Sequence, residues 1–317
     1  MLERAAPICV RRRAGLAGRV MAHGSRVCPG CGRINSVDDK SCFHCGKSLP
    51  GPLATSLLGY FSDFSEDGLP ATKVLMGTCI LVYALCLVSD GPSAVLGRGS
   101  GAMDFGSFSG STLMRVGALL GAYIQHEPWR VLSAVFVHGS LLHIGMNMLS
   151  LMRLGSTLEP HFRSARFLLL YLISGALGFV CTVWSRGDMA FSVGASGAIF
   201  GLLGAFIGAL IIRRNPGWQQ VFYSNLILAA ALAFFVPNVD NSAHGGGFLA
   251  GLVLGILLEL ERQPRKRDRL AMALAALGLL AVVASVVLSA RSPVWKAYRS
   301  AEQEQAERAE RHRLETE

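Results

Sequence analysis

The chain contains seven apolar stretches, each close to the length of a membrane-spanning helix. A helix that crosses a bilayer needs about 20 mostly apolar residues. Of the 317 residues, 51% are hydrophobic and 16% are charged, and the mean hydropathy of +0.42 is too high for a typical soluble domain. We therefore predict an all-α fold, a polytopic membrane helical bundle. The predicted spans cover residues 73–89, 132–152, 167–184, 194–212, 221–237, 244–260 and 270–290.

Positive charge collects at alternate connections between these spans. Arg163 and Arg166 follow the second span, Arg213 and Arg214 follow the fourth, and the basic segment 262–269 follows the sixth. Because Lys and Arg near span ends are retained on the cytoplasmic side, we expect these connections and the N-terminus in the cytoplasm. The even-numbered spans then run from outside inward. The net charge of +9 reflects this topology, and no aromatic residues are interleaved with the basic ones, so we do not expect nucleic acid as a partner.

Four cysteines ahead of the first span have the spacing of a zinc site. Two CxxC pairs, Cys28 with Cys31 and Cys42 with Cys45, stand close together in the sequence. Two such pairs can form a closed tetrahedral site with four thiolates. A pair of disulfides is the alternative, but thiolates in the reducing cytoplasm bind metal more often than they oxidise. We predict one structural zinc ion, with His44 as a bystander.

The regions before the first predicted span and after the last form four segments. We expect a disordered N-terminal extension over residues 1–25, in which Met21 is a candidate true start, a zinc ribbon over 26–48 and a linker over 49–72. The ribbon is a candidate docking module for a cytoplasmic partner, by analogy with other small ribbons. The charged tail, residues 291–317, has no continuous apolar stripe and is expected to form a solvated or frayed helix on the non-cytoplasmic side, where it could bind a partner.

A serine and a histidine stand at the starts of two predicted spans. Gly194-Ala195-Ser196-Gly197 opens the fourth span and Ala243-His244-Gly245 opens the sixth. At about 1.5 Å per residue, Ser196 and His244 are each roughly 25 Å from the basic inner ends of their helices. They should therefore lie at the same depth, near the outer leaflet.

Glycines recur along both of these helices and predict that their backbones touch. Ordinary helix packing explains the glycines, but an ionisable histidine within a span is costly unless it has a partner or a function. We therefore predict a contact between Ser196 and His244. The glycines are Gly197, Gly201, Gly204 and Gly208 in the fourth span and Gly247, Gly251 and Gly255 in the sixth.

The second span adds His143 and Asn147, four residues apart and so on one face of a helix. Such groups can donate hydrogen bonds to an oxyanion in a site sheltered from bulk water. The alternative is a structural role, in which both side chains bond to neighbouring carbonyl groups. Because Ser196 and His244 are expected near the same depth, we favour the catalytic interpretation.

These residues together resemble the rhomboid intramembrane serine proteases. The resemblance covers roughly residues 73–261 as a six-helix core, with 270–290 as the additional C-terminal transmembrane helix that many members carry. It rests on four motifs in the right order: Glu127-Pro128-Trp129-Arg130 with Phe136 and His138, the segment His143–Asn147, Gly194–Gly197, and Ala243-His244 followed by Gly247 and Gly251.

The resemblance implies that Ser196 is the nucleophile and His244 the general base of a dyad. His143, Asn147 and the backbone N–H of Ser196 would then bind the oxyanion, and Phe200 would stack on the base. Expected substrates are single-span transmembrane proteins, cleaved near the outer end of the span in a cavity that opens to the outside.

The resemblance also suggests structural roles for other residues. Trp129 and Arg130 belong to a long loop, residues 90–130, that lies partly in the outer leaflet. Glu159 matches an acidic position of the family and is expected to hold the neighbouring basic loop. Asp240, with Asn241, is interpreted as a helix N-cap rather than as a third catalytic residue.

The competing hypothesis is a catalytically silent rhomboid-like protein that binds membrane clients. Relatives of that kind usually lack the serine or the histidine, and both are present here. A transporter is disfavoured because the spans show no inverted repeat, and the HExxH and GxGD motifs of other membrane proteases are absent. The compact core and the lack of a transit sequence suggest the cell membrane of a bacterium.

Overall fold

The structure is a computed structural model that describes residues 20–21, 25–28, 34–36, 39–42, 44–49, 69–91, 106–235, 239–261 and 264–316. The chain divides into two units, Met1–Glu66 and Asp67–Glu317. Each is considered separately below.

The N-terminal unit contains a three-stranded antiparallel sheet. Its strands are β1 (Val20–Met21), β2 (Ser25–Val27) and β3 (Ile34–Ser36), in the order β1-β2-β3. Farther along, the Cys42 amide donates to the Lys47 carbonyl at 2.8 Å, which closes a tight turn between them. The described residues of this unit are thus a small sheet followed by a cysteine-bearing turn.

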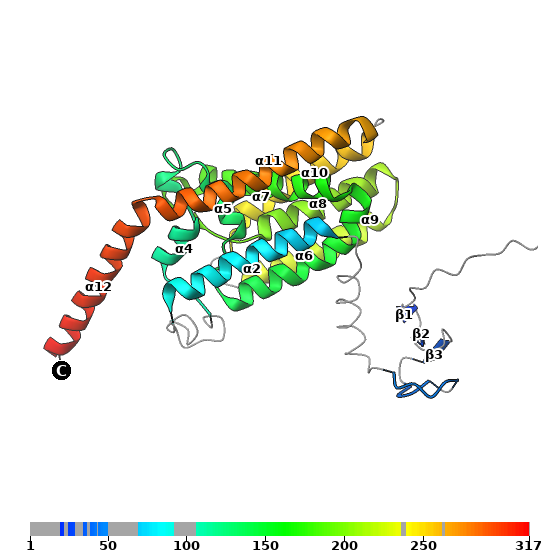
Figure 1. The fold of residues 1–317 in the computed structure, drawn as a ribbon, viewed down its shortest axis with the longest axis horizontal. Coiled ribbons are helices and arrows are strands. Elements are labelled where there is room, and N and C mark those ends of the chain that lie inside the picture. The colour runs from blue at the N-terminus through cyan, green and yellow to red at the C-terminus, as the bar shows by residue number, and fades with distance from the viewer. Residues whose placement is uncertain are drawn as a thin grey trace, which may run out of the picture. The chain divides into compact units, whose positions relative to one another are not determined.

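The second unit is a bundle of helices (Figure 1). Two short strands, β4 (Leu119–Leu120) and β5 (Phe191–Ser192), pair beside it, and three short 3-10 turns connect its elements. The helices are α2 (Pro70–Asp90), α4 (Gly110–Val116), α5 (Arg130–Ser133), α6 (Leu141–Phe162), α7 (Ser164–Arg186), α8 (Ser196–Ile212), α9 (Gly217–Phe235), α10 (Asn241–Leu260), α11 (Pro264–Arg291) and α12 (Val294–Thr316).

Several of these helices are long and apolar enough to cross a membrane. Among the described residues, four meet this test alone: Pro70–Asp90, Ser164–Met189, Asn241–Leu260 and Arg269–Arg291. A fifth candidate is the pair Arg130–Phe136 and Leu141–Phe162, and α8 is a shorter apolar helix. The architecture agrees with the predicted polytopic helical bundle.

The second predicted span is wrong in its position. We expected a helix over residues 132–152, but the chain bends by 91° between Phe136 and Leu141, and α6 continues to Phe162. Ser140 begins the new helix because its hydroxyl accepts from the His143 amide at 3.3 Å. The apolar residues before the bend, Ala134–Val137, are fully buried in protein. Burial in a protein core and exposure to lipid select the same apolar residues, which is why the sequence suggested a single span.

The glycine stripes bring α8 and α10 into backbone contact, as predicted. A Cβ atom on Gly247 would collide with the carbonyl oxygen of Gly197, and one on Gly251 would collide with that of Gly201. Only glycine permits this approach, which holds the two helices in parallel register along their length.

Glu159, near the end of α6, was expected to hold the neighbouring basic loop, and the structure shows its carboxylate bonded to α2. Its carboxylate accepts hydrogen bonds from the backbone amides of Ala71 and Thr72, each at 2.8 Å, and from the Thr72 hydroxyl at 2.6 Å. These amides belong to the first turn of α2, whose N–H groups have no partner within the helix. Glu159 therefore anchors α2 to α6.

The C-terminal helices are tied to the loop that precedes α5. The indole of Trp129 donates to Ser289 of α11 at 3.2 Å, and the Ser292 hydroxyl donates to the buried carboxylate of Glu127. The tail forms a helix, α12, but its first turns are not simply solvated, because the Arg115 guanidinium of α4 lies 5.0 Å from the Trp295 ring centre. Tyr298 and Glu302 of α12 also lie beside Gly110 of α4, and the rest of α12 extends away from the bundle (Figure 1).

Candidate active site

Ser196 and His244 lie within hydrogen-bond distance of each other. Ser196 is the first residue of α8, and His244 is in the first turn of α10. The His244 Nε2 atom is 2.8 Å from the Ser196 hydroxyl oxygen, and both side chains are half-buried. The glycine contact between α8 and α10 begins directly beside them, at Gly197 and Gly247. The predicted contact is therefore present, and an imidazole placed in this way can accept the proton of the hydroxyl.

The aromatic ring of Phe200 stacks on His244. The ring centres are 4.4 Å apart and the planes are inclined by only 21°. Phe200 lies four residues after Ser196 on α8, so one turn of helix places the ring over the imidazole. This stacking restricts the orientation of the His244 ring while leaving Nε2 directed at Ser196.

Asp240 is the N-cap of α10, as the sequence suggested. Its carboxylate accepts from the Ala243 amide at 3.1 Å and from the Thr182 hydroxyl at 2.7 Å, and Arg186 lies 3.7 Å away. It contacts His244 through the backbone, because its carbonyl accepts from the His244 amide. Within the described part of the chain, no carboxylate is hydrogen-bonded to the His244 side chain, so the geometry is that of a pair rather than a triad.

His143 and Asn147 face the turn that leads into Ser196. Gly194, two residues before the serine, has φ +123°, and a Cβ atom built on it would lie 2.6 Å from His143 Nε2 and 3.9 Å from Asn147 Nδ2. The Asn147 amide donates to the His143 carbonyl at 3.0 Å. Two side chains with N–H donors thus lie beside the backbone that carries Ser196.

Gly194 opens the serine motif, and the structure gives it a role that the motif alone did not indicate. Its amide donates to the Ala134 carbonyl at 2.9 Å, which fixes the approach to α8. The positive φ and the close contact with His143 both exclude a side chain. The available signal was a glycine two residues before a candidate nucleophile at the start of a helix.

The imidazole ring of His138 packs against that of His143. The two imidazole rings meet edge to face with centres 5.2 Å apart, and His138 Nδ1 lies 3.2 Å from the Phe136 carbonyl oxygen. Its Nε2 atom is buried without a hydrogen-bond partner among the residues described. His138, just before α6, and His143, in its first turn, therefore lie against each other.

Three of the four predicted zinc ligands gather in the N-terminal unit. The sulfur atoms of Cys28, Cys42 and Cys45 all lie within 4.8 Å of one another, and those of Cys28 and Cys45 are 3.6 Å apart. Cys31 lies outside the described residues. Three converging thiols, two of them buried, have the donor chemistry of a structural zinc site.

Comparison with known protein families finds a match in the part of the chain that contains these residues. Residues 125–261 match the model of the rhomboid domain. This segment runs from Gln125 through α10 and includes Ser196 and His244. This part of the chain is therefore similar to a rhomboid domain, and the apolar helices agree with an integral membrane protein.

Relatives with rhomboid names come from several kingdoms. RHOMBOID-like protein 5 of Arabidopsis thaliana is 44% identical over 48% of this chain and 51% of its own length. The rhomboid protease GluP of Bacillus subtilis is 35% identical over 50% of this chain and 31% of its own. Rhomboid-type serine protease 2 of Emericella nidulans is 35% identical over 46% of this chain and 30% of its own. The matches thus span about half or less of each relative's length, and two of these names specify a protease.

Proposed function

We propose that this protein is an intramembrane serine endopeptidase with Ser196 as nucleophile and His244 as general base. The observation that carries the proposal is the 2.8 Å contact between His244 Nε2 and the Ser196 hydroxyl at the starts of two apolar helices. The similarity to two relatives named as proteases supports it.

In the proposed reaction the Ser196 oxygen attacks the carbonyl carbon of the scissile peptide bond as His244 Nε2 takes the hydroxyl proton. His143, Asn147 and the Ser196 amide donate to the oxyanion of the tetrahedral intermediate. That amide has no acceptor in the preceding turn because Ser196 begins α8. His244 then gives its proton to the leaving amine, and a water molecule activated by His244 hydrolyses the acyl-serine.

The proposed substrates are single-span transmembrane proteins with small or helix-destabilising residues near the outer end of the span. A peptide bond within an intact helix is shielded by its own hydrogen bonds, so the substrate must unwind before Ser196 can reach it. Apolar helices around a polar pair favour substrates that are already in the bilayer.

Labelling with a fluorophosphonate tests the proposal directly. The detergent-purified full-length protein and its Ser196→Ala and His244→Ala variants are compared by mass spectrometry. We expect one covalent adduct, on Ser196, in the wild type and none in either variant, with unchanged thermal unfolding. A folded wild type that takes up no label would favour the catalytically silent, client-binding alternative, and a search for bound membrane proteins would replace the search for substrates.

We further propose that Cys28, Cys31, Cys42 and Cys45 hold one structural zinc ion. The convergence of three of these sulfur atoms and the CxxC spacing of the fourth support this. Metal analysis should find about one zinc per chain and none after Cys28→Ser with Cys31→Ser. A zinc-free wild type that remains folded would contradict the site. The ribbon's proposed role is to bind a cytoplasmic partner.

The proposed orientation places the active site toward the outside and the basic connections in the cytoplasm. Arg163 and Arg166 of the α6–α7 connection and Arg213 and Arg214 after α8 support this. An N-terminal tag should therefore resist protease added to intact cells. The bacterial cell membrane is a prediction from the sequence alone, and the relatives above come from a plant, a bacterium and a fungus.

A further inference from the structure

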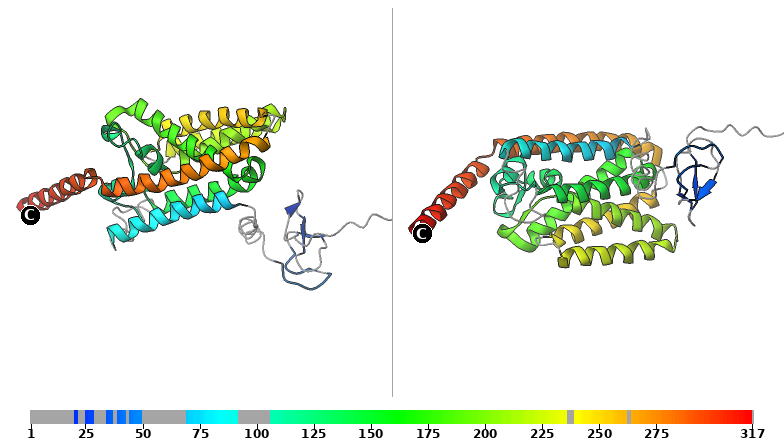
Figure 2. Two further views of the ribbon diagram at one scale, coloured as in Figure 1. Left: turned by 45° about the horizontal axis from the view of Figure 1, so that its top comes forward. Right: turned by 90° about the horizontal axis from the view of Figure 1, so that it is seen from below.

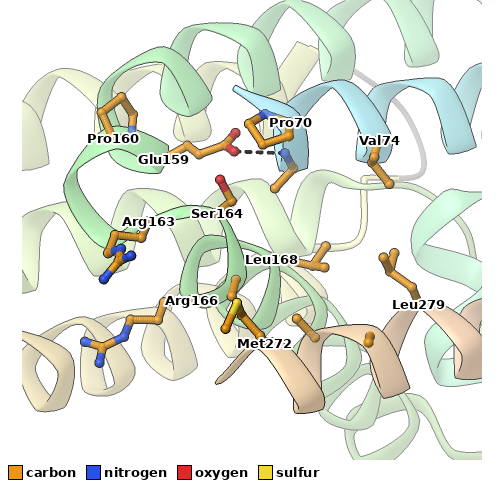
Figure 3. A pocket seen from close by; sticks show the side chains of 14 residues that line it. Pro70, Val74, Glu159, Pro160, Arg163, Ser164, Arg166, Leu168, Met272 and Leu279 are labelled. Atoms are coloured by element: carbon orange, nitrogen blue, oxygen red, sulfur yellow. Dashed lines mark hydrogen bonds between the residues drawn. The ribbon is translucent and has the colours of Figure 1, made fainter. Parts of the chain in front are cut away.

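The C-terminal end of α11 lies against the loop and the short helices that precede α6. Figure 1 and Figure 2 show this end of α11 beside α4 and α5. Nearer its start, α11 lines a groove of about 570 Å³ with Met272 and Leu279 (Figure 3). Helices α11 and α12 come after the segment that matches the rhomboid domain. The contact therefore joins a part of the chain outside that match to the loop before α6.

Two hydroxyl groups at this end of α11 bond to the loop. Ser292, which directly follows α11, donates to the carboxylate of Glu127, and Ser289 accepts from the Trp129 indole at 3.2 Å. Ser289, Ser292 and Glu127 are all buried. A hydrogen bond to a charged carboxylate is stronger than one between neutral groups. The bond from Ser292 is therefore the stronger of the two.

Glu127 extends this constraint to the start of strand β4. Its carboxylate also accepts from the Arg130 guanidinium, which is fully buried. The same guanidinium donates to the carbonyl oxygens of Met114 at 2.8 Å and Ala118 at 3.0 Å. Ala118 directly precedes β4. One carboxylate thus contacts Ser292 on α11's side and, through Arg130, the backbone that leads into β4.

Strand β4 and the chain after α5 hold the segment that leads into Ser196. β4 pairs with β5, and the Gly121 amide donates to the Ala190 carbonyl at 2.7 Å. Just after α5, the Ala134 carbonyl accepts from the Gly194 amide at 2.9 Å. The held segment ends two residues before Ser196. A displacement of the loop would therefore displace the proposed nucleophile.

We propose that α11 positions the nucleophile through these contacts and that Ser292 is a positioning residue for the proposed protease. The Ser292 hydroxyl fixes Glu127, and Glu127 holds the loop through Arg130. The loop in turn holds the segment before Ser196. The inference rests on the proposed function, because the position of Ser196 affects a rate only if Ser196 reacts.

The rate of fluorophosphonate labelling of Ser196 in the detergent-purified full-length protein tests this role. Ser292→Ala removes the hydroxyl from Glu127. It should lower the maximal labelling rate about tenfold, because a displacement of about 1 Å at a catalytic group costs about 100-fold and the β4–β5 pairing remains. The reagent concentration that gives half the maximal rate should not change. Ser292→Thr keeps a hydroxyl and should recover most of the rate.

Ser285→Ala is the matched control. Ser285 is buried in the same helix, but its hydroxyl donates at 2.7 Å to the Val282 carbonyl of α11 itself. This variant should label at the wild-type rate. Equal rates for Ser292→Ala and Ser285→Ala, with both folded by thermal unfolding, would overturn the positioning role. Failure of Ser292→Thr to recover the rate would do the same.

Ser289→Ala provides a second test if Ser292→Ala does not fold. It removes the bond to the Trp129 indole and should slow labelling by about threefold, because a bond between neutral groups is weaker than one to a carboxylate. A rate equal to that of Ser285→Ala would then overturn the proposal. A folded wild type that takes up no label would overturn both this inference and the proposed protease, whereas a labelled wild type with equal variant rates would overturn this inference alone.

Discussion

Asn147 offers a test of oxyanion binding at the scale of a single residue. Its amide donates to the His143 carbonyl and lies near Gly194, beside Ser196. Asn147→Ala should lower kcat by about 10²–10³-fold with little change in KM, because an oxyanion donor acts mainly in the transition state. Cleavage of a single-span substrate in detergent measures both constants.

The matched control is Asn225→Ala on α9. Asn225 also donates to the carbonyl four residues before it, Val221, at 2.8 Å, so both substitutions remove the same kind of bond. Asn225→Ala should leave kcat unchanged. Equal rates for the two variants would remove Asn147 from the proposed oxyanion site.

Gly194 tests how closely the backbone must approach His143. Gly194→Ala introduces a methyl group that would meet His143 Nε2 and places alanine at φ +123°. We expect activity to fall by about 10²-fold, the cost of a displacement of about 1 Å at a catalytic group. Gly245→Ala, beside His244 but with open space around its Cβ, should retain activity. Full activity of Gly194→Ala would show that the turn is adaptable.

At the scale of elements, the contact between α8 and α10 is what brings Ser196 to His244. Gly251→Ala would press a methyl group onto the Gly201 carbonyl oxygen and should destabilise the protein by about 1–3 kcal/mol. Gly77→Ala on α2 has no atom within 4 Å of the added Cβ and should be neutral or slightly stabilising. Thermal unfolding in detergent distinguishes them, and equal midpoints would contradict backbone contact.

The elements also show where apolar pattern is ambiguous. Residues 132–137 and 141–152 read as one span, yet the first part is buried in protein and the second begins a new helix at the Ser140 cap. The bend matters for the proposed site because His143, in the first turn of the helix that follows it, lies beside Gly194 at the approach to α8. The hydropathy of a residue does not distinguish burial in a protein core from exposure to lipid.

At the scale of the whole molecule, the chain divides into two compact units, the N-terminal unit and the helical bundle. The site residues of the proposed protease all belong to the bundle, residues 67–317. Deletion of residues 1–60 should therefore spare fluorophosphonate labelling of Ser196 in detergent, and zinc chelation should do the same. Loss of labelling with the bundle still folded would show that the ribbon contributes to the enzyme.

The sequence by itself singled out the residues proposed to carry the chemistry. The shared depth of Ser196 and His244 followed from the rise of a helix per residue, and the stacking of Phe200 on His244 was expected from the resemblance to the rhomboid proteases. The glycine stripes predicted which helices touch. The CxxC pairs predicted a cysteine cluster, of which Cys28, Cys42 and Cys45 are seen together.

Only the tertiary structure decided the partners of groups far apart in the chain. Glu159 anchors α2 across 87 residues, and Ser292 reaches Glu127 across 165. Buried polar side chains such as these form hydrogen bonds with whichever polar groups the fold places beside them. The spacing of residues in the sequence determines which of them share a face of one helix. Which residues of other helices they contact depends on how all the helices pack.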